Sequence, residues 1–136
     1  MIYLDSAALV KLARTELHSA DLVEWLDNRS PGESLAASSL VQVEVPRALR
    51  RSAPGRLRAV PGILSSLHLI EMTPVILATA AAYEDPNLRS LDAIHLATVE
   101  VLIQHSRTVT AFVAYDKRLL DAAEAIGLPV AAPGLS

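Results

Sequence analysis

Short apolar runs alternate along the chain with longer amphipathic segments, which is the pattern of strands that alternate with helices. Residues 2–4 form a β-prone run that ends at Asp5, and residues 6–13 directly behind it favour a helix. Further strands are predicted over residues 34–37, 68–72, 109–114 and 128–131, and further helices over residues 20–28, 39–51, 75–83, 90–103 and 117–126. This order predicts an α/β/α domain, in which a mostly parallel sheet of about four or five strands is flanked by helices.

Serine residues stand where two of the predicted helices begin, and serine is a preferred N-cap. Ser38 and Ser39 lie at the start of the helix over residues 39–51, and Ser90 lies at the start of the long apolar helix. All three are expected to cap. Pro46 lies inside the first of these helices and removes one backbone donor, so a kink or a broken turn is expected there.

The composition indicates one domain over residues 1–136 that carries more apolar surface than it can hide. No repeats, low-complexity tracts or linkers interrupt the chain, and the Pro–Gly pairs at residues 54–55 and 61–62 predict loops inside this domain. The hydrophobic fraction is 51%, the charged fraction is 20% and the mean hydropathy is +0.34, values that exclude intrinsic disorder. A single small core does not cover so much apolar surface, so a partner or a dimer is expected.

The chain contains no cysteine, which excludes disulfides, thiolate metal sites and a cysteine nucleophile. Its first residues lack the basic segment of a signal peptide, and charges or prolines interrupt every long apolar run. We therefore expect a cytoplasmic protein without a membrane-spanning segment.

Four acidic residues do not fit their apolar surroundings or stand where strands end. Asp5 and Asp116 follow predicted strands and precede helices, where an N-cap aspartate is also common. Asp92 lies in the first turn of a helix that is apolar around most of its circumference, and Glu44 lies between two valines. Ligands gather outside the carboxyl ends of the strands in parallel sheets, so these acids are candidates for a shared site at that edge.

Four converging carboxylates would need a compensating charge. Two carboxylates about 4 Å apart repel each other by roughly 4 kcal/mol at an effective dielectric constant near 20. Protons or a divalent cation would relieve this repulsion, and a set of oxygen ligands suits a hard ion such as Mg²⁺ or Mn²⁺. The four histidines include no pair four residues apart, so no zinc helix is indicated. Two roles are open to His95, one turn after Asp92: a partner that orients a metal ligand, or an ordinary helix histidine with a local hydrogen bond, which we expect.

The net charge of −3 argues at first against a nucleic-acid partner. Setting the four candidate ligands aside leaves 11 acidic against 12 basic residues, a balance of +1. Residues 45–70 contain no acid but five arginines: Arg47, Arg50, Arg51, Arg56 and Arg58. Such a stretch either faces phosphates or is a solvated helix end. Beside a carboxylate cluster that holds Mg²⁺, it would suit the hydrolysis of a phosphodiester by a metal-activated water.

Four segments carry a resemblance that spans essentially the whole chain. They are residues 1–11, 38–49, 88–97 and 112–123, and they contain Asp5, Glu44, Asp92 and Asp116 in this order. Successive acids are 39, 48 and 24 residues apart. In these segments the sequence resembles the PIN-domain family and, within it, the VapC-type ribonuclease toxins of toxin–antitoxin pairs.

The resemblance implies a Mg²⁺- or Mn²⁺-dependent endoribonuclease with a PIN-like α/β/α fold. In this interpretation Asp5, Glu44 and Asp92 hold the metal, and Asp116 is a further ligand or positions the water. The resemblance also implies frequent homodimers and inhibition by a cognate VapB-like antitoxin.

Two features bear on how such a site would act. Arg47, Arg51 and Lys11 are the basic residues expected to guide the phosphates of RNA. Members of the family often carry Thr or Ser two residues before the last aspartate, and here that position is Ala114. The missing hydroxyl bears on how strongly Asp116 takes part. Asp121, another acid nearby, is expected to face solvent.

The main alternative is a non-catalytic PIN-fold module that binds RNA or a protein, with the acids as caps and salt-bridge partners. Ala114 is the one feature that favours it. A phosphoacceptor receiver domain would carry an acidic pair near the end of its first strand, whereas Asp5 has no acidic neighbour. A dehalogenase-type phosphatase would carry a second aspartate two residues later, where this chain has Ala7.

Overall fold

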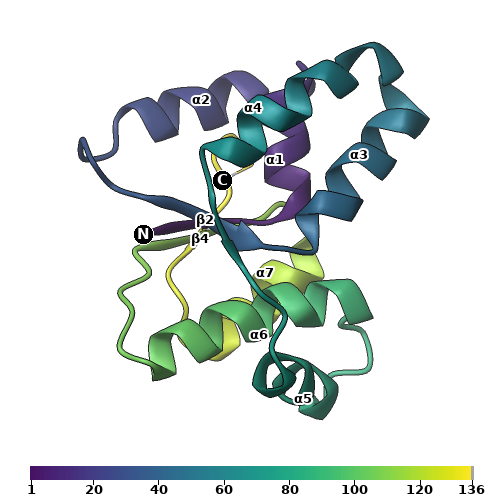
Figure 1. Cartoon of the computed structure of the whole chain (residues 1–136). Helices are drawn as coiled ribbons and strands as arrows, with labels where there is room; N and C mark the ends of the chain where they lie inside the picture. The colour runs from purple at the N-terminus through teal and green to yellow at the C-terminus, as the bar shows by residue number, and fades with distance from the viewer. Residues whose placement is uncertain (136) are drawn as a thin grey trace.

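The computed structural model describes residues 1–135 and contains a five-stranded parallel sheet between two layers of helices (Figure 1). The strands are β1 (Ile2–Leu4), β2 (Leu35–Ser38), β3 (His68–Ile70), β4 (Ala111–Val113) and β5 (Val130–Ala131), in the spatial order β3-β2-β1-β4-β5. The helices are α1 (Ser6–Ala13), α2 (Ser19–Asp27), α3 (Val41–Ser52), the 3₁₀ helix η1 (Pro54–Ala59), α4 (Val60–Ser65), α5 (Pro74–Ala82), α6 (Ser90–Gln104) and α7 (Lys117–Ala125). The α/β/α fold predicted from the sequence is confirmed.

Alternate residues of the strands supply the two halves of the core. In β1, Ile2 and Leu4 pack with residues of α1, α2, α3 and α4, whereas Tyr3 packs with residues of α6 and α7. Figure 1 shows the first group of helices on one face of the sheet and α5, α6 and α7 on the other. Both faces are therefore buried, which explains why the strands are apolar at almost every position.

The strands that follow β1 in the sequence are added first on one side of β1 and then on the other. The strands β2 and β3 extend the sheet on one side of β1, and β4 and β5 extend it on the other. In sheets of this kind the usual ligand position is the crevice at the carboxyl ends of the strands where this change occurs. Asp5 follows β1 and Asp116 lies three residues after β4, so both acids are at this edge.

Three predicted strands are present but shorter than expected. The strand β3 ends at Ile70 instead of Met72, β4 covers Ala111–Val113 instead of residues 109–114, and β5 covers only Val130–Ala131. Local β propensity extends beyond these ends, but a strand lasts only as long as it has a hydrogen-bonded neighbour.

The capping predictions for the serines are wrong. The N-cap of α3 is Leu40, which has no side-chain cap, and Ser38 instead accepts the Leu40 N–H within the turn after β2. At α6 the N-cap is Arg89, which has an extended backbone, and Ser90 is already the first helical residue. The end of a strand and the backbone of a loop thus decide where these helices begin.

The helix α3 runs without a break from Val41 to Ser52 although Pro46 lies inside it, so the expected broken turn is absent. Proline at position 46 leaves the carbonyl of Gln42 without its helical donor. Gln42 is exposed, so water can solvate that carbonyl.

Two short helices, η1 and α4, lie in a segment that was expected to be loop. Each has a proline at its first or second position, which favours a helix start, but a Pro–Gly pair is equally a turn signal. Within residues 1–135, no helix is both long and apolar enough to cross a membrane.

Candidate active site

One cavity of about 310 Å³ at the carboxyl edge of the sheet contains all four acids predicted from the sequence. The acids are Asp5, Glu44, Asp92 and Asp116, and the other lining residues are Ser6, Ala7, Arg89, Ser90 and Leu91. A larger hollow of about 570 Å³ beside α1 and α2 contains none of these acids. The fold therefore brings together four carboxylates that are far apart in the sequence.

Asp5 is fixed at the junction of β1 and α1. It is the N-cap of α1, and its Oδ1 accepts the backbone N–H of Ala8 at 2.9 Å. Only 4% of the residue is exposed, and burial is the main cause that raises the pKa of Asp5 to about 6. The charges of Asp92 and Glu44 raise this pKa as well, while His95 and the Ala8 N–H oppose the rise. Such a perturbed acid in a cavity is typical of functional sites.

Glu44 lies on α3 and is held by a histidine from α6. His95 Nε2 lies 2.7 Å from Glu44 Oε1, and His95 Nδ1 lies 2.7 Å from the hydroxyl of Tyr3. The local hydrogen bond predicted for His95 is therefore wrong, because its partners are 51 and 92 residues away. Its position one turn after Asp92 indicates the alternative role, a partner that orients a metal ligand, but does not identify Glu44 as that ligand.

Arg89 joins the two remaining acids. Its Nε lies 3.0 Å from Asp92 Oδ2, and its Nη2 lies 3.3 Å from Asp116 Oδ2. The hydrogen bond with Asp92 and the charges of both acids raise the pKa of the Arg89 guanidinium. Asp116 is also the N-cap of α7, because its Oδ1 accepts the N–H groups of Arg118 and Leu119. Sequence reasoning missed Arg89, since an arginine at the end of a loop has no distinctive pattern.

Each acid of the cavity is thus engaged by a donor of the protein itself. In this arrangement, no three acidic or histidine side chains of residues 1–135 are grouped closely enough to hold a metal ion. The chemistry of the donor set nevertheless fits a hard divalent cation, because all four side chains offer carboxylate oxygen. At Asp92 and Asp116, a cation would compete with the guanidinium of Arg89.

Comparison with known protein families gives a match over most of the chain. The model of the family described as PIN domain matches residues 2–125. The chain belongs to the PIN-domain family. Within it, the chain is 50% identical over 134 residues to Ribonuclease VapC35 of Mycobacterium tuberculosis, an alignment that covers 98% of both chains.

Solved structures share the PIN-domain fold at low sequence identity. A structure of VapC20 from Mycobacterium tuberculosis, described as a sarcin–ricin loop cleaving toxin, has a TM-score of 0.71 at 14% identity and covers 94% of this chain and 96% of that one. A toxin–antitoxin complex from Klebsiella pneumoniae has a TM-score of 0.70 at 19% identity and covers 98% of both chains. These two likenesses agree with the sheet order and helix layers described above.

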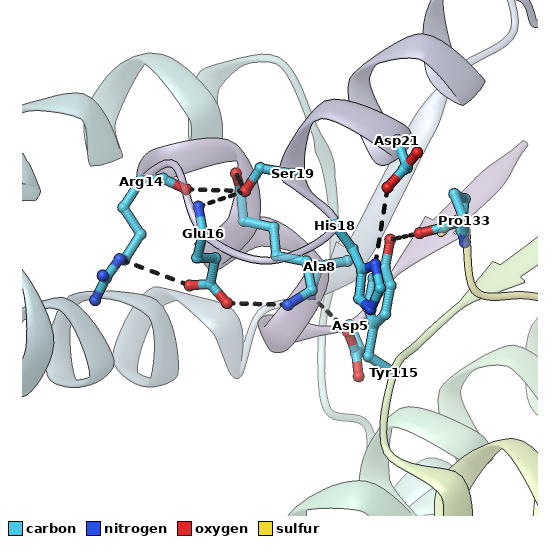
Figure 2. A network of polar contacts seen from close by, with 10 residues as sticks. Asp5, Ala8, Arg14, Glu16, His18, Ser19, Asp21, Tyr115 and Pro133 are labelled. Carbon is cyan, nitrogen blue, oxygen red and sulfur yellow. Dashed lines mark hydrogen bonds and ion pairs between the residues drawn. The ribbon is translucent and has the colours of Figure 1, made fainter. Parts of the chain in front are cut away.

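Lys11 is not among the residues that line the cavity of this PIN domain. Its Nζ lies 2.9 Å from Glu16 Oε2 and 4.6 Å from the centre of the Tyr115 ring, and only 10% of its side chain is exposed. Figure 2 shows that Glu16 also faces Arg14, and that Tyr115 lies beside Asp5. The ammonium is already paired and covered, which speaks against the RNA contact predicted for Lys11.

The other basic residues predicted to meet RNA remain accessible in the PIN domain. Arg47 and Arg51 are exposed on α3, about one and two turns after Glu44, and neither forms an ion pair within residues 1–135. Asp121 has a side chain that is 60% exposed and pairs with Lys117, in agreement with its predicted solvent position.

Ala114 is wholly buried in the apolar core that the sheet of the PIN domain forms with α6 and α7. The hydroxyl that other family members often carry at this position is therefore replaced by a methyl group that serves packing. Asp116 relies for its orientation on the first N–H groups of α7 and on Arg89.

Replacing Arg89 by glutamine is expected to tighten Mn²⁺ binding to the RNA-free protein about fivefold. The substitution removes the guanidinium that competes with Mn²⁺ for Asp92 and Asp116. The side chain of Arg89 is 61% exposed, so solvent screens its two ion pairs, and together they are worth at most about 1 kcal/mol. Isothermal titration calorimetry measures the change. Lys117→Gln is the matched control, because it removes a nearby positive charge whose ion-pair partner is Asp121, outside the cavity. Equal affinities of Arg89→Gln and the parent would contradict the competition.

Proposed function

We propose that this chain is a Mg²⁺- or Mn²⁺-dependent endoribonuclease and the toxin of a VapBC-type toxin–antitoxin pair. The observation that carries the proposal is the gathering of Asp5, Glu44, Asp92 and Asp116 around one cavity at the carboxyl edge of the sheet. It is supported by 50% identity to a protein named Ribonuclease VapC35 over 98% of both chains. Residues 1–136 would act as one nuclease domain in the cytoplasm, where RNA is the substrate.

In this proposal, Asp5, Glu44, Asp92 and Asp116 hold the cation. A bound Mg²⁺ or Mn²⁺ lowers the pKa of a bound water and stabilises the leaving oxygen of a phosphodiester. The protein contributes carboxylates that are oriented in advance. Asp5 and Asp116 are fixed as N-caps, and Glu44 is fixed by its hydrogen bond to His95. Because Asp5 has a pKa of about 6, it is ionised and able to bind a cation at neutral pH.

Cleavage of a mixed cellular RNA pool by the purified, antitoxin-free protein tests this function. We expect discrete fragments in Mg²⁺ or Mn²⁺ that are absent in EDTA. The variant Asp121→Asn is a matched control, because Asp121 is exposed and lies outside the cavity. If the folded protein leaves the pool intact in both metals, or cuts equally well in EDTA, the proposed function is wrong.

The double variant Arg47→Ala with Arg51→Ala is expected to weaken RNA binding and its salt dependence. Each phosphate of a single strand that the protein neutralises adds about 0.7 to the slope of log K against log salt, so removing two arginines should reduce the slope by about 1.4. Binding to RNA in the Asp92→Asn background, which prevents cleavage, measures this slope. A control that removes Arg58 and Arg107 changes the net charge equally, but Arg58 lies on η1 and Arg107 follows α6. Equal slopes in both double variants would contradict the assignment.

The protein partners proposed for the chain are a cognate VapB-like antitoxin and a second copy of itself. The antitoxin is supported by the likeness to a toxin–antitoxin complex from Klebsiella pneumoniae. The homodimer is supported by α5, which contains no charged residue and exposes Val75 at 54% and Leu77 at 46%. Leu91, which lines the acidic cavity, is 48% exposed as well. One small core does not cover all the apolar surface of the chain, and a second copy packed over these side chains would bury a further part of it.

One observation favours the second candidate function, a non-catalytic PIN-fold module that binds RNA or a protein. Every acid of the cavity already has a donor of the protein, as expected of caps and salt-bridge partners. Calorimetry with Mn²⁺ separates the two functions. A nuclease site binds Mn²⁺ and loses this binding in Asp92→Asn, whereas a binding module shows no Mn²⁺ binding that depends on the carboxylates.

A further inference from the structure

A buried pair of polar side chains lies behind Glu44. Tyr3 comes from β1 and is wholly buried, and His95 comes from α6 and is 1% exposed. The Tyr3 hydroxyl lies 2.7 Å from His95 Nδ1, and His95 Nε2 lies 2.7 Å from Glu44 Oε1. The three residues belong to three elements, so this Tyr3–His95–Glu44 relay ties the carboxylate on α3 to the central strand and to α6.

The donors around the Tyr3 hydroxyl favour one direction for these hydrogen bonds. The backbone N–H of Ser38 lies 3.1 Å from the Tyr3 hydroxyl oxygen, and an N–H only donates, so that oxygen accepts. The single hydroxyl proton is then available for His95 Nδ1. With Nδ1 as acceptor, the ring proton lies on Nε2 and is donated to Glu44 Oε1.

The surroundings of this pair leave little freedom to the imidazole. The Tyr3 ring stacks on Phe112 with centroids 5.5 Å apart and an interplanar angle of 4°. The His95 ring meets the Tyr3 ring edge-on, at 5.9 Å and 69°. Both residues are closed to solvent, so water cannot replace the hydrogen bond between them. Within residues 1–135, Glu44 Oε2 has no hydrogen-bond donor, which leaves this oxygen for a ligand in the cavity.

We propose that Tyr3 and His95 are positioning residues for Glu44, in which the Tyr3 hydroxyl selects the imidazole tautomer that donates to the carboxylate. The proposal rests on the proposed function in one respect, namely that the cavity binds a divalent cation. Independently of the cation, the orientation of Glu44 depends on the Tyr3 hydroxyl, which acts on Glu44 through His95. Partners of this kind, placed behind a ligand, typically contribute about 10- to 100-fold to metal affinity.

The first experiment records the imidazole nitrogen shifts of the metal-free protein by long-range ¹H–¹⁵N correlation. We expect His95 to show a protonated Nε2 and an unprotonated Nδ1. In Tyr3→Phe, which keeps the ring stacked on Phe112, the Nδ1 shift should move because its donor is gone. A His95 ring with the proton on Nδ1, or on both nitrogens, would overturn the proposal.

The second experiment measures Mn²⁺ affinity by calorimetry in the same variants. Tyr3→Phe and His95→Gln are expected to bind Mn²⁺ about 10- to 100-fold more weakly than the parent. His105→Gln is the matched control, since His105 lies at the end of the same helix and its ring Nδ1 bonds to the Val101 carbonyl, far from Glu44 in the sequence. If His95→Gln fails to fold, Tyr3→Phe alone decides, because it removes one hydroxyl and no packing.

The Tyr3–His95–Glu44 relay and the proposed function fail in different ways. If the relay is wrong, the parent binds Mn²⁺ and cleaves RNA, and folded Tyr3→Phe binds Mn²⁺ as tightly as the parent does. If the proposed function is wrong but the relay is right, the parent leaves RNA intact and Mn²⁺ binding still weakens in Tyr3→Phe. A parent protein that binds no Mn²⁺ overturns both.

Discussion

The variants Asp92→Asn and Asp5→Asn are each expected to lower the rate of RNA cleavage at least about 100-fold. Removing one carboxylate charge from a cation site costs several kcal/mol of transition-state stabilisation, and each 1.4 kcal/mol corresponds to about tenfold in rate. Asparagine has nearly the same shape as aspartate, and at position 5 it can still accept the N–H of Ala8. The loss should therefore arise from the missing charge rather than from a changed fold.

The four acids should not contribute equally. Asp116 uses one carboxylate oxygen for two backbone N–H groups of α7, and an asparagine oxygen can keep both hydrogen bonds. We expect a smaller loss for Asp116→Asn, about tenfold, because only Oδ2 of Asp116 is left for the cation and Arg89 competes for that oxygen.

Single-turnover cleavage of one mapped RNA site, with circular dichroism as the test of folding, measures all three variants together with Asp121→Asn. Asp121 is exposed and pairs with Lys117, so this control should cleave at the parent rate. A control that loses as much activity as Asp92→Asn would show that net charge, and not the cavity, governs the rate.

The positions of the acids could be predicted because the fold places them by a simple rule. Strands of a parallel sheet end at one edge, so an acid that directly follows a predicted strand is already located in space. Asp5 and Asp116 are found in this way. Asp92 and Glu44 are found through their contrast with apolar neighbours, because a charge on a buried face needs a partner.

The partners of those acids could not be predicted, because they depend on contacts between distant elements. His95 contacts Glu44, 51 residues away, and Tyr3, 92 residues away, and no periodic pattern in the sequence indicates either contact. Arg89 precedes Asp92 by one turn, but its second contact, with Asp116, exists only once α6 and α7 are packed together.

The RNA contact of Lys11 stays a prediction, and the packing around its side chain speaks against it for a related reason. A lysine one and a half turns after Asp5 is a reasonable candidate to reach a phosphate, judged by sequence distance alone. The segment after α1 instead brings Glu16 against its ammonium, and the loop between β4 and α7 brings the ring of Tyr115. The sequence indicates the charge of a side chain, whereas the neighbours that neutralise it follow from tertiary packing.

The metal-free variant Asp5→Asn is expected to be more stable than the parent at neutral pH, by up to about 3 kcal/mol of free energy of unfolding. The pKa of Asp5 is raised from 3.8 to about 6 in the folded protein. The folded state therefore binds the proton more tightly than the unfolded state does, and the parent loses stability as the pH rises from about 4 to 6. The difference between these two pKa values corresponds to about 3 kcal/mol of free energy of unfolding, and the parent has lost all of it above pH 6. Asparagine does not ionise, so the variant escapes this loss.

Urea unfolding in EDTA at pH 4, 5, 6 and 7 measures the difference between Asp5→Asn and the parent. The difference should be near zero at pH 4, grow through pH 5 and level off between pH 6 and 7, whereas Asp121→Asn should show no such trend. A difference of opposite sign, or one that is independent of pH, would show that burial does not penalise the Asp5 charge. With the expected result, one substitution stabilises the fold and abolishes cleavage, which is the pattern of a carboxylate kept for chemistry at the expense of stability.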